Sequence, residues 1–336
     1  MSVPPRWRIA LLVLGFACLA FGVAGGLARL TGAPAPGAAI AWHGPLMVSG
    51  FLGAVIALER AVALGRLWAF AAPLAAGLGG ALVLLGAAPA GFVLMALAAA
   101  LLSAANLVLV RRQPSLEMGT LLAGAGAWLA GGIALLLDAP AVPWWIAFFV
   151  LTIAGERLEL SRYRKRSPWV RRSFGLLVLL SLLAAFAPRA LGAVLALFAL
   201  WLLAFDLARL TIRQDRLPRY VAACLLAGYA WLALGGALMA LSVAYDAALH
   251  AIFIGFVLSM VFGHAPVILP AVLRVRYSYH PVLYLPLLAL HLSLAVRVFA
   301  SIPAGAWGNA AAIALFIGVS ASRASSGRPT RSAPGR

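Results

Sequence analysis

Long uninterrupted apolar runs are the feature that most restricts what this chain can fold into. A helix needs about 20 mostly apolar residues to cross the hydrocarbon core of a bilayer. The runs are continuous rather than alternating, which excludes a transmembrane β-barrel. We therefore predict an all-α, polytopic membrane protein with twelve transmembrane helices. The predicted helices lie at about 7–30, 38–64, 67–86, 87–110, 117–137, 142–158, 173–188, 190–208, 220–243, 246–273, 279–299 and 304–320.

The composition supports this prediction and excludes several other classes of protein. Apolar residues make up 65% of the 336 residues and charged residues only 10%, whereas soluble domains carry about 25% charged residues. A soluble globular enzyme, a disordered chain and a disulfide-rich secreted module are therefore excluded. Cys18 and Cys224 both lie in apolar runs and form neither a disulfide framework nor a CxxC metal motif. No nucleophile–base–acid set, phosphate loop or paired carboxylate site is visible, so enzymatic activity is left open but not favoured.

Basic residues predict how the chain is oriented in the membrane. The formal net charge is +18, with 26 Lys+Arg against 8 Asp+Glu. With a cytoplasmic N-terminus, 23 of these basic residues fall at inner ends, and only Arg29, Arg189 and Arg297 fall at outer ends. This asymmetry obeys the positive-inside rule, and attraction to anionic lipids explains the charge without nucleic acid. Together with the Arg- and Ala-rich composition, it predicts a multi-pass protein of the bacterial inner membrane, with both termini cytoplasmic and the lipid bilayer as partner.

The chain divides into one membrane domain and a tail. Residues 1–320 form the predicted transmembrane domain. Residues 321–336 are rich in Ser, Arg, Gly and Pro, which predicts a disordered, basic, cytoplasmic tail.

A short spacing pattern indicates internal repetition. In the second, sixth and tenth predicted helices, an acid or a histidine follows eight residues after a phenylalanine. The three pairs are Phe51 and Glu59, Phe148 and Glu156, and Phe256 and His264. The pattern predicts three four-helix pseudo-repeats, with chance similarity in an Ala- and Leu-rich chain as the alternative. The repeats would cover about 1–113, 114–218 and 219–320.

All five histidines fall in the second, tenth and eleventh predicted helices. His43 and His250 lie on different helices, each ~7 Å below the outer surface at a rise of 1.5 Å per residue. Two imidazoles at one depth can ligate a single haem iron, and imidazole also binds copper, zinc and other iron centres. We therefore predict His43 and His250 as cofactor ligands. The alternative is ordinary hydrogen bonding between helices.

Other ionisable residues give further candidates. His264 and His291 are candidates for a second, deeper metal site, with His280 near the inner interface as a third candidate ligand. Arg29 and Arg297 could pair with haem propionates at the outer surface, or extend to lipid headgroups. The neighbouring pairs Glu59-Arg60 and Glu156-Arg157 are expected to be solvated or interfacial ion pairs at the inner helix ends, with a proton path through Glu59 as the alternative.

Two helices resemble a known family. The run Trp42-His43-Gly44-Pro45-Leu46-Met47-Val48-Ser49-Gly50-Phe51 resembles the W-H-x-H-E-M-x-x-G-F helix of the NnrS family, and His250-Ala251 with Gly263-His264 resembles its late His-Ala…Gly-His helix. This resemblance implies a twelve-helix membrane protein that contains haem and copper and is linked to the nitric-oxide response. The family in turn resembles subunit I of the haem-copper oxidases, in which histidines of helices two and ten hold a low-spin haem. By this resemblance, His43 and His250 would be the haem ligands.

The chain also departs from the family pattern. Pro45 and Leu46 replace the second histidine and the glutamate, and the sixth and seventh predicted helices lack the histidines that bind copper in the oxidases. An oxygen- or nitric-oxide-reducing binuclear centre is therefore not expected.

Three functions follow as hypotheses. The first is a haem- or metal-binding membrane protein of the nitric-oxide or respiratory stress response, with respiratory-chain or metalloenzyme partners and with copper as a second candidate cofactor. The alternatives are a twelve-helix secondary transporter and a cofactor-free membrane assembly factor.

Overall fold

A computed structural model describes residues 3–161 and 167–325, and these residues are almost entirely helical. Long α-helices are interrupted by two π-helices, η1 and η3, and by two 3₁₀ turns, η2 and η4. The elements are α1 (Pro5–Thr31), α2 (His43–Pro45), η1 (Leu46–Gly53), α3 (Ala54–Leu64), η2 (Leu67–Phe70), α4 (Ala71–Leu84), α5 (Ala88–Arg112), α6 (Leu116–Leu136), α7 (Val142–Leu160), α8 (Pro168–Ala184), α9 (Pro188–Phe205), α10 (Ala208–Thr211), α11 (Arg216–Ala240), α12 (Tyr245–His250), η3 (Ala251–Leu258), α13 (Ser259–Leu273), β1 (Arg276–Tyr277), η4 (Pro281–Leu283), α14 (Tyr284–Phe299), α15 (Ile302–Arg323) and β2 (Ala324–Ser325).

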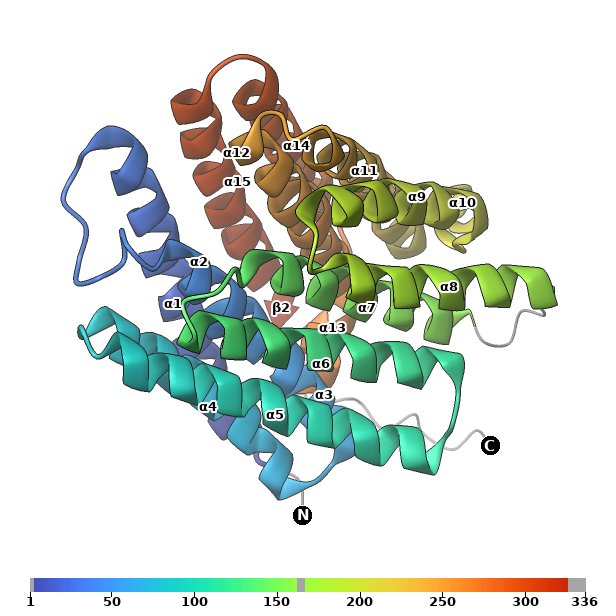
Figure 1. The fold of residues 1–336 in the computed structure, drawn as a ribbon, viewed down its shortest axis with the longest axis horizontal. Coiled ribbons are helices and arrows are strands. Elements are labelled where there is room, and N and C mark those ends of the chain that lie inside the picture. Colours follow the sequence, from blue (N-terminus) through green and yellow to red (C-terminus); the bar gives the residue numbers. More distant parts are fainter. Residues whose placement is uncertain (1–2, 162–166, 326–336) are drawn as a thin grey trace, which may run out of the picture.

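Helices that follow one another in the chain pack side by side (Figure 1). Short connections between consecutive helices force this arrangement. The most extensive contacts join α4 to α5, α5 to α6, α6 to α7, α9 to α11, and α14 to α15.

Among the described residues, ten helical segments are long and apolar enough to cross a membrane. They correspond to ten of the predicted runs. The other two runs are also helical, but α7 carries three charged residues near its C-terminal end and α8 has only 17 residues. The all-α prediction is confirmed, and the chain is a multi-pass membrane protein. The predicted total of twelve spans goes beyond these ten.

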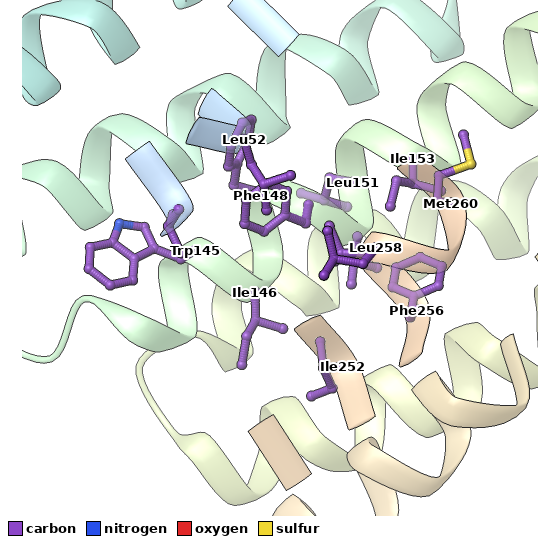
Figure 2. Close-up of a cluster of buried hydrophobic side chains, with 14 of the residues drawn as sticks. Leu52, Trp145, Ile146, Phe148, Leu151, Ile153, Ile252, Phe256, Leu258 and Met260 are labelled. Atoms are coloured by element: carbon purple, nitrogen blue, oxygen red, sulfur yellow. The ribbon is translucent and has the colours of Figure 1, made fainter. Parts of the chain in front are cut away.

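Helix α7 lies at the centre of the bundle, where nearly all of its residues are buried. Side chains from η1, α7 and η3 gather in one hydrophobic core, which includes Leu52, Phe148 and Leu258 (Figure 2). Trp128 of α6 stacks on Phe148 with ring centroids 5.1 Å apart. Gly53 lets the Trp128 ring lie against η1, since a Cβ atom at Gly53 would lie 2.3 Å from that ring. Helix α7 thus packs in one core with the two π-helical segments.

The two π-helices follow His43 and His250 closely. η1 begins three residues after His43, and η3 begins directly after His250. Each has eight residues, although π-helical structure usually occurs as single turns and is concentrated at functional sites. Both histidines therefore lie where the backbone departs from regular α-helix.

The predicted tail differs from the structure at its start. α15 continues to Arg323, and β2 pairs with β1 in an antiparallel ladder that places Tyr277 opposite Ala324. Disorder from residue 321 is therefore wrong for 321–325. The segment after α13 forms β1, the partner strand of β2. Just after β1, the Ser278 N–H donates to the Arg323 carbonyl oxygen at 3.2 Å. Residues 326–336 lie outside the described part of the chain.

Candidate functional site

A cavity of about 440 Å³ lies between α1, the α2–η1 segment, the α12–η3 segment, α14 and α15. Its lining includes all four residues predicted as cofactor-binding: His43, His250, Arg29 and Arg297. The volume falls within the range of roughly 300–1,000 Å³ that is usual for small-molecule and cofactor sites. Most of the other lining residues are apolar. These include Val23, Leu27, Met47, Leu52, Trp145, Leu249, Phe253, Ile254 and Ile313.

The imidazole of His43 is held against α1. Its Nδ1 lies 2.6 Å from the carbonyl oxygen of Gly22. Because a carbonyl only accepts, Nδ1 carries the proton and Nε2 keeps its lone pair. The ring also packs on Gly26, where an added Cβ would lie 2.9 Å from Cε1 of His43. Within the described residues, Nε2 has no hydrogen-bond partner.

His250 is held in the same tautomer. Its Nδ1 lies 2.8 Å from the backbone oxygen of Asp246 and 3.3 Å from the Asp246 Oδ1 atom. No described residue forms a hydrogen bond with Nε2. Histidines that ligate a metal commonly donate their other ring N–H to a carbonyl or carboxylate, which fixes the ring. Both cavity histidines show this arrangement.

The two cavity arginines differ in their partners. Arg297 forms a bidentate ion pair with Asp246, through Nε at 2.9 Å and through Nη2 at 2.8 Å. Arg29 instead donates to the backbone carbonyls of Ile40 and Ala41, and it has no acidic partner among the described residues. The Arg297 charge is therefore balanced within the protein, while Arg29 leaves the cavity with one net positive charge when both histidines are neutral.

The three histidines predicted for a metal site have separate partners. His291 accepts a hydrogen bond from the Trp231 indole at 3.0 Å, and its other nitrogen lies 3.3 Å from the Ser259 hydroxyl. His280 is exposed and caps η4, where its Nδ1 accepts from Val282 N–H at 3.1 Å. His291 therefore has the role of a hydrogen-bonding residue between helices, and His280 that of a cap.

His264 belongs to a second group that the sequence analysis did not assemble. Its Nε2 lies 3.7 Å from Oε1 of Glu59 and 3.6 Å from Oε2 of Glu156. One ligand atom from each of the three residues lies within 4.8 Å of the others. The three residues come from α3, α7 and α13, and they are the ones that share the eight-residue spacing after a phenylalanine. That spacing was the signal that could have identified the group.

The ion pairs expected between neighbouring residues were wrong. Arg60 pairs with Glu156 at 3.3 Å, and Arg157 pairs with Asp206 at 3.1 Å. All four side chains are buried. Adjacent residues of a helix point in different directions, so each charge finds its partner on another helix instead of beside it in the sequence.

These features define an all-helical, multi-pass membrane protein with a histidine-lined cavity between its helices. Residues 8–325 match the family described as Domain of unknown function (DUF8744), and the chain belongs to this family. No curated protein and no solved structure matches the chain significantly. The family description states no activity, so the function must be argued from the geometry of the sites.

Proposed function

We propose that this chain is a haem-binding membrane protein in which His43 and His250 would hold the haem iron. The observation that carries the proposal is the shared state of the two imidazoles. Both line one cavity, each Nδ1 is held by a backbone carbonyl, and each Nε2 lacks a partner in the described chain. Such imidazoles are suited to ligate iron through Nε2.

The rest of the cavity supports a haem group. Its apolar side chains suit a macrocycle, and Arg29 offers a cation without an acidic partner in the described chain for a propionate. A bound haem would supply one-electron chemistry.

The wider proposal follows the resemblance to the NnrS family. It places the chain in the bacterial inner membrane with both termini cytoplasmic, twelve spans in three four-helix pseudo-repeats, and a role in the nitric-oxide or respiratory stress response. The meeting of Glu59, Glu156 and His264 supports the repeats, because residues at equivalent positions come together near the centre of the bundle. Copper is a second candidate cofactor, and respiratory-chain components or metalloenzymes are the proposed partners.

A spectrum of the purified protein tests the proposal. We expect protein from haem-replete cells, purified in mild detergent, to give a reduced-minus-oxidised spectrum typical of low-spin haem, with about one haem per chain. Haem is quantified against protein after denaturation. A colourless, iron-free preparation from such cells would contradict the proposal and favour the cofactor-free assembly factor.

Replacing Gly26 with valine should weaken the site through His43. The new side chain would press on the imidazole, whose Cε1 lies 2.9 Å from the position of an added Cβ. Overpacking of this kind costs about 1–3 kcal/mol, and the displaced ring should lower the haem-to-protein ratio. Gly126→Val is the matched control, because nothing lies within 4 Å of a Cβ atom there. Equal haem content in Gly26→Val and Gly126→Val would argue against His43 as a ligand.

A further inference from the structure

The group formed by Glu59, Glu156 and His264 lies apart from the histidine-lined cavity. Glu59 follows His43 by 16 residues, and His264 follows His250 by 14. At the rise of an α-helix these steps correspond to ~21–24 Å along the two helices. None of the three residues is among those that line the cavity in the described chain. The three residues therefore take no part in the proposed haem binding.

The positions of the donor atoms are compatible with one ion bound by all three residues. The distances from His264 Nε2 to the two carboxylate oxygens, 3.7 and 3.6 Å, exceed normal hydrogen-bond lengths. Three donors that each lie about 2.1 Å from one metal ion, at 120° to one another, would be separated by ~3.6 Å. The two distances from His264 Nε2 match this spacing, and the three ligand atoms all lie within 4.8 Å of one another.

The charges of the group favour a cation. Side-chain exposure is 26% for Glu59, 11% for Glu156 and 18% for His264, so water screens these charges poorly. Arg60 balances one of the two carboxylates by its ion pair with Oε1 of Glu156. Glu59 has no arginine or lysine partner within the described residues. With His264 neutral, one negative charge remains in a place where an unbalanced charge is costly, and either a bound cation or a proton on His264 would balance it.

Arg60 also holds one ligand in position. It occupies Oε1 of Glu156 and leaves Oε2 directed at His264. Outer groups that fix a ligating carboxylate in this way are typical of metal sites and influence affinity strongly.

We propose that Glu59, Glu156 and His264 bind one divalent first-row transition-metal ion. The donor set of two carboxylates and one imidazole determines this class, because imidazole suits zinc and iron, while magnesium and calcium prefer oxygen ligands throughout. Three protein ligands leave further coordination positions open, as in catalytic or exchangeable sites rather than closed structural ones.

Metal titration of the full-length protein tests this proposal. The protein is purified in mild detergent, stripped with a chelator and titrated with Zn²⁺ or Mn²⁺ alone, and bound metal is measured by mass spectrometry after gel filtration. We expect about one equivalent of metal per wild-type chain. Glu59→Gln and His264→Gln should each weaken binding by ~10-fold or more, because each removes one ligand. With Mn²⁺, electron paramagnetic resonance should show nitrogen coupling that His264→Gln removes.

Two controls separate metal binding from damage to the fold. Glu117→Gln makes the same chemical change at another buried acid, which pairs with Arg171 at 3.4 Å, and should leave the titration unchanged. Gel filtration shows whether each variant remains folded. The absence of stoichiometric binding by the wild type, as expected for a network that shares only protons, would overturn the proposal. Unchanged affinity in folded Glu59→Gln and His264→Gln would overturn it as well. Neither result depends on whether haem is bound in the cavity.

Discussion

Alanine at either His43 or His250 is expected to abolish the low-spin haem spectrum of the purified protein. Each substitution removes one of the two imidazoles that would hold the iron, and the remaining histidine cannot supply the second. Loss of even a supporting contact to a metal ligand commonly costs 10–100-fold in affinity, so loss of the ligand itself should lower haem content by more than ~10-fold. The measurement is the haem-to-protein ratio together with the reduced-minus-oxidised spectrum.

Two other histidines provide matched controls for this result. His280→Ala changes an exposed cap, and His291→Ala changes an imidazole whose two nitrogens already bond to Trp231 and Ser259. Both variants should retain haem. A wild-type spectrum in the folded double variant of His43 and His250 would disprove haem binding by these residues. A spectrum lost equally in all four single variants would indicate damage to the fold instead.

Alanine at Asp206 is expected to give the largest loss of stability. Asp206 forms a buried bidentate pair with Arg157, with distances of 3.1 and 3.2 Å, and side-chain exposures of 7% for Arg157 and 2% for Asp206. It also accepts a hydrogen bond from Ala208 N–H at 2.6 Å. Removing one partner leaves the other charge buried and unpaired, which costs about 3–5 kcal/mol. The free energy of unfolding is measured by titrating the protein in mild detergent with a denaturing detergent.

The control for this prediction is another aspartate on the same part of the chain. Asp215 is exposed and makes no side-chain cap at the start of α11, so Asp215→Ala should change the free energy by less than about 0.5 kcal/mol. Replacing both members of the pair, as Arg157→Met with Asp206→Leu, should recover most of the loss, since no buried charge is then left alone. Equal stability of Asp206→Ala and wild type would show that the pair contributes nothing.

Counting residues along two apolar helices predicted one depth for His43 and His250. A rise of 1.5 Å per residue turns a position in the sequence into a depth in the membrane, provided that the helix ends are known to within a turn. The structure then places both side chains at one cavity. The cavity itself was beyond the sequence, because its shape depends on how α1, α14 and α15 pack around these two helices.

The partners of the charged residues were harder to predict. Asp246 joins Arg297, which lies 51 residues later in the sequence, and Arg60 joins Glu156, 96 residues later. Such pairs are decided by which helix faces meet, and the sequence gives no direct signal of that. The two π-helices were not predicted from the sequence either. Neither η1 nor η3 contains a proline that would indicate an irregular helix.

The packing of His43 on a bare glycine links two positions that lie far apart in the sequence. A side chain at position 26 and an imidazole at position 43 compete for the same space. Other members of the family can therefore acquire a bulkier residue at the first position only when the second has also changed. In an alignment of the family, these two columns should vary together, and glycine at the first should accompany histidine at the second.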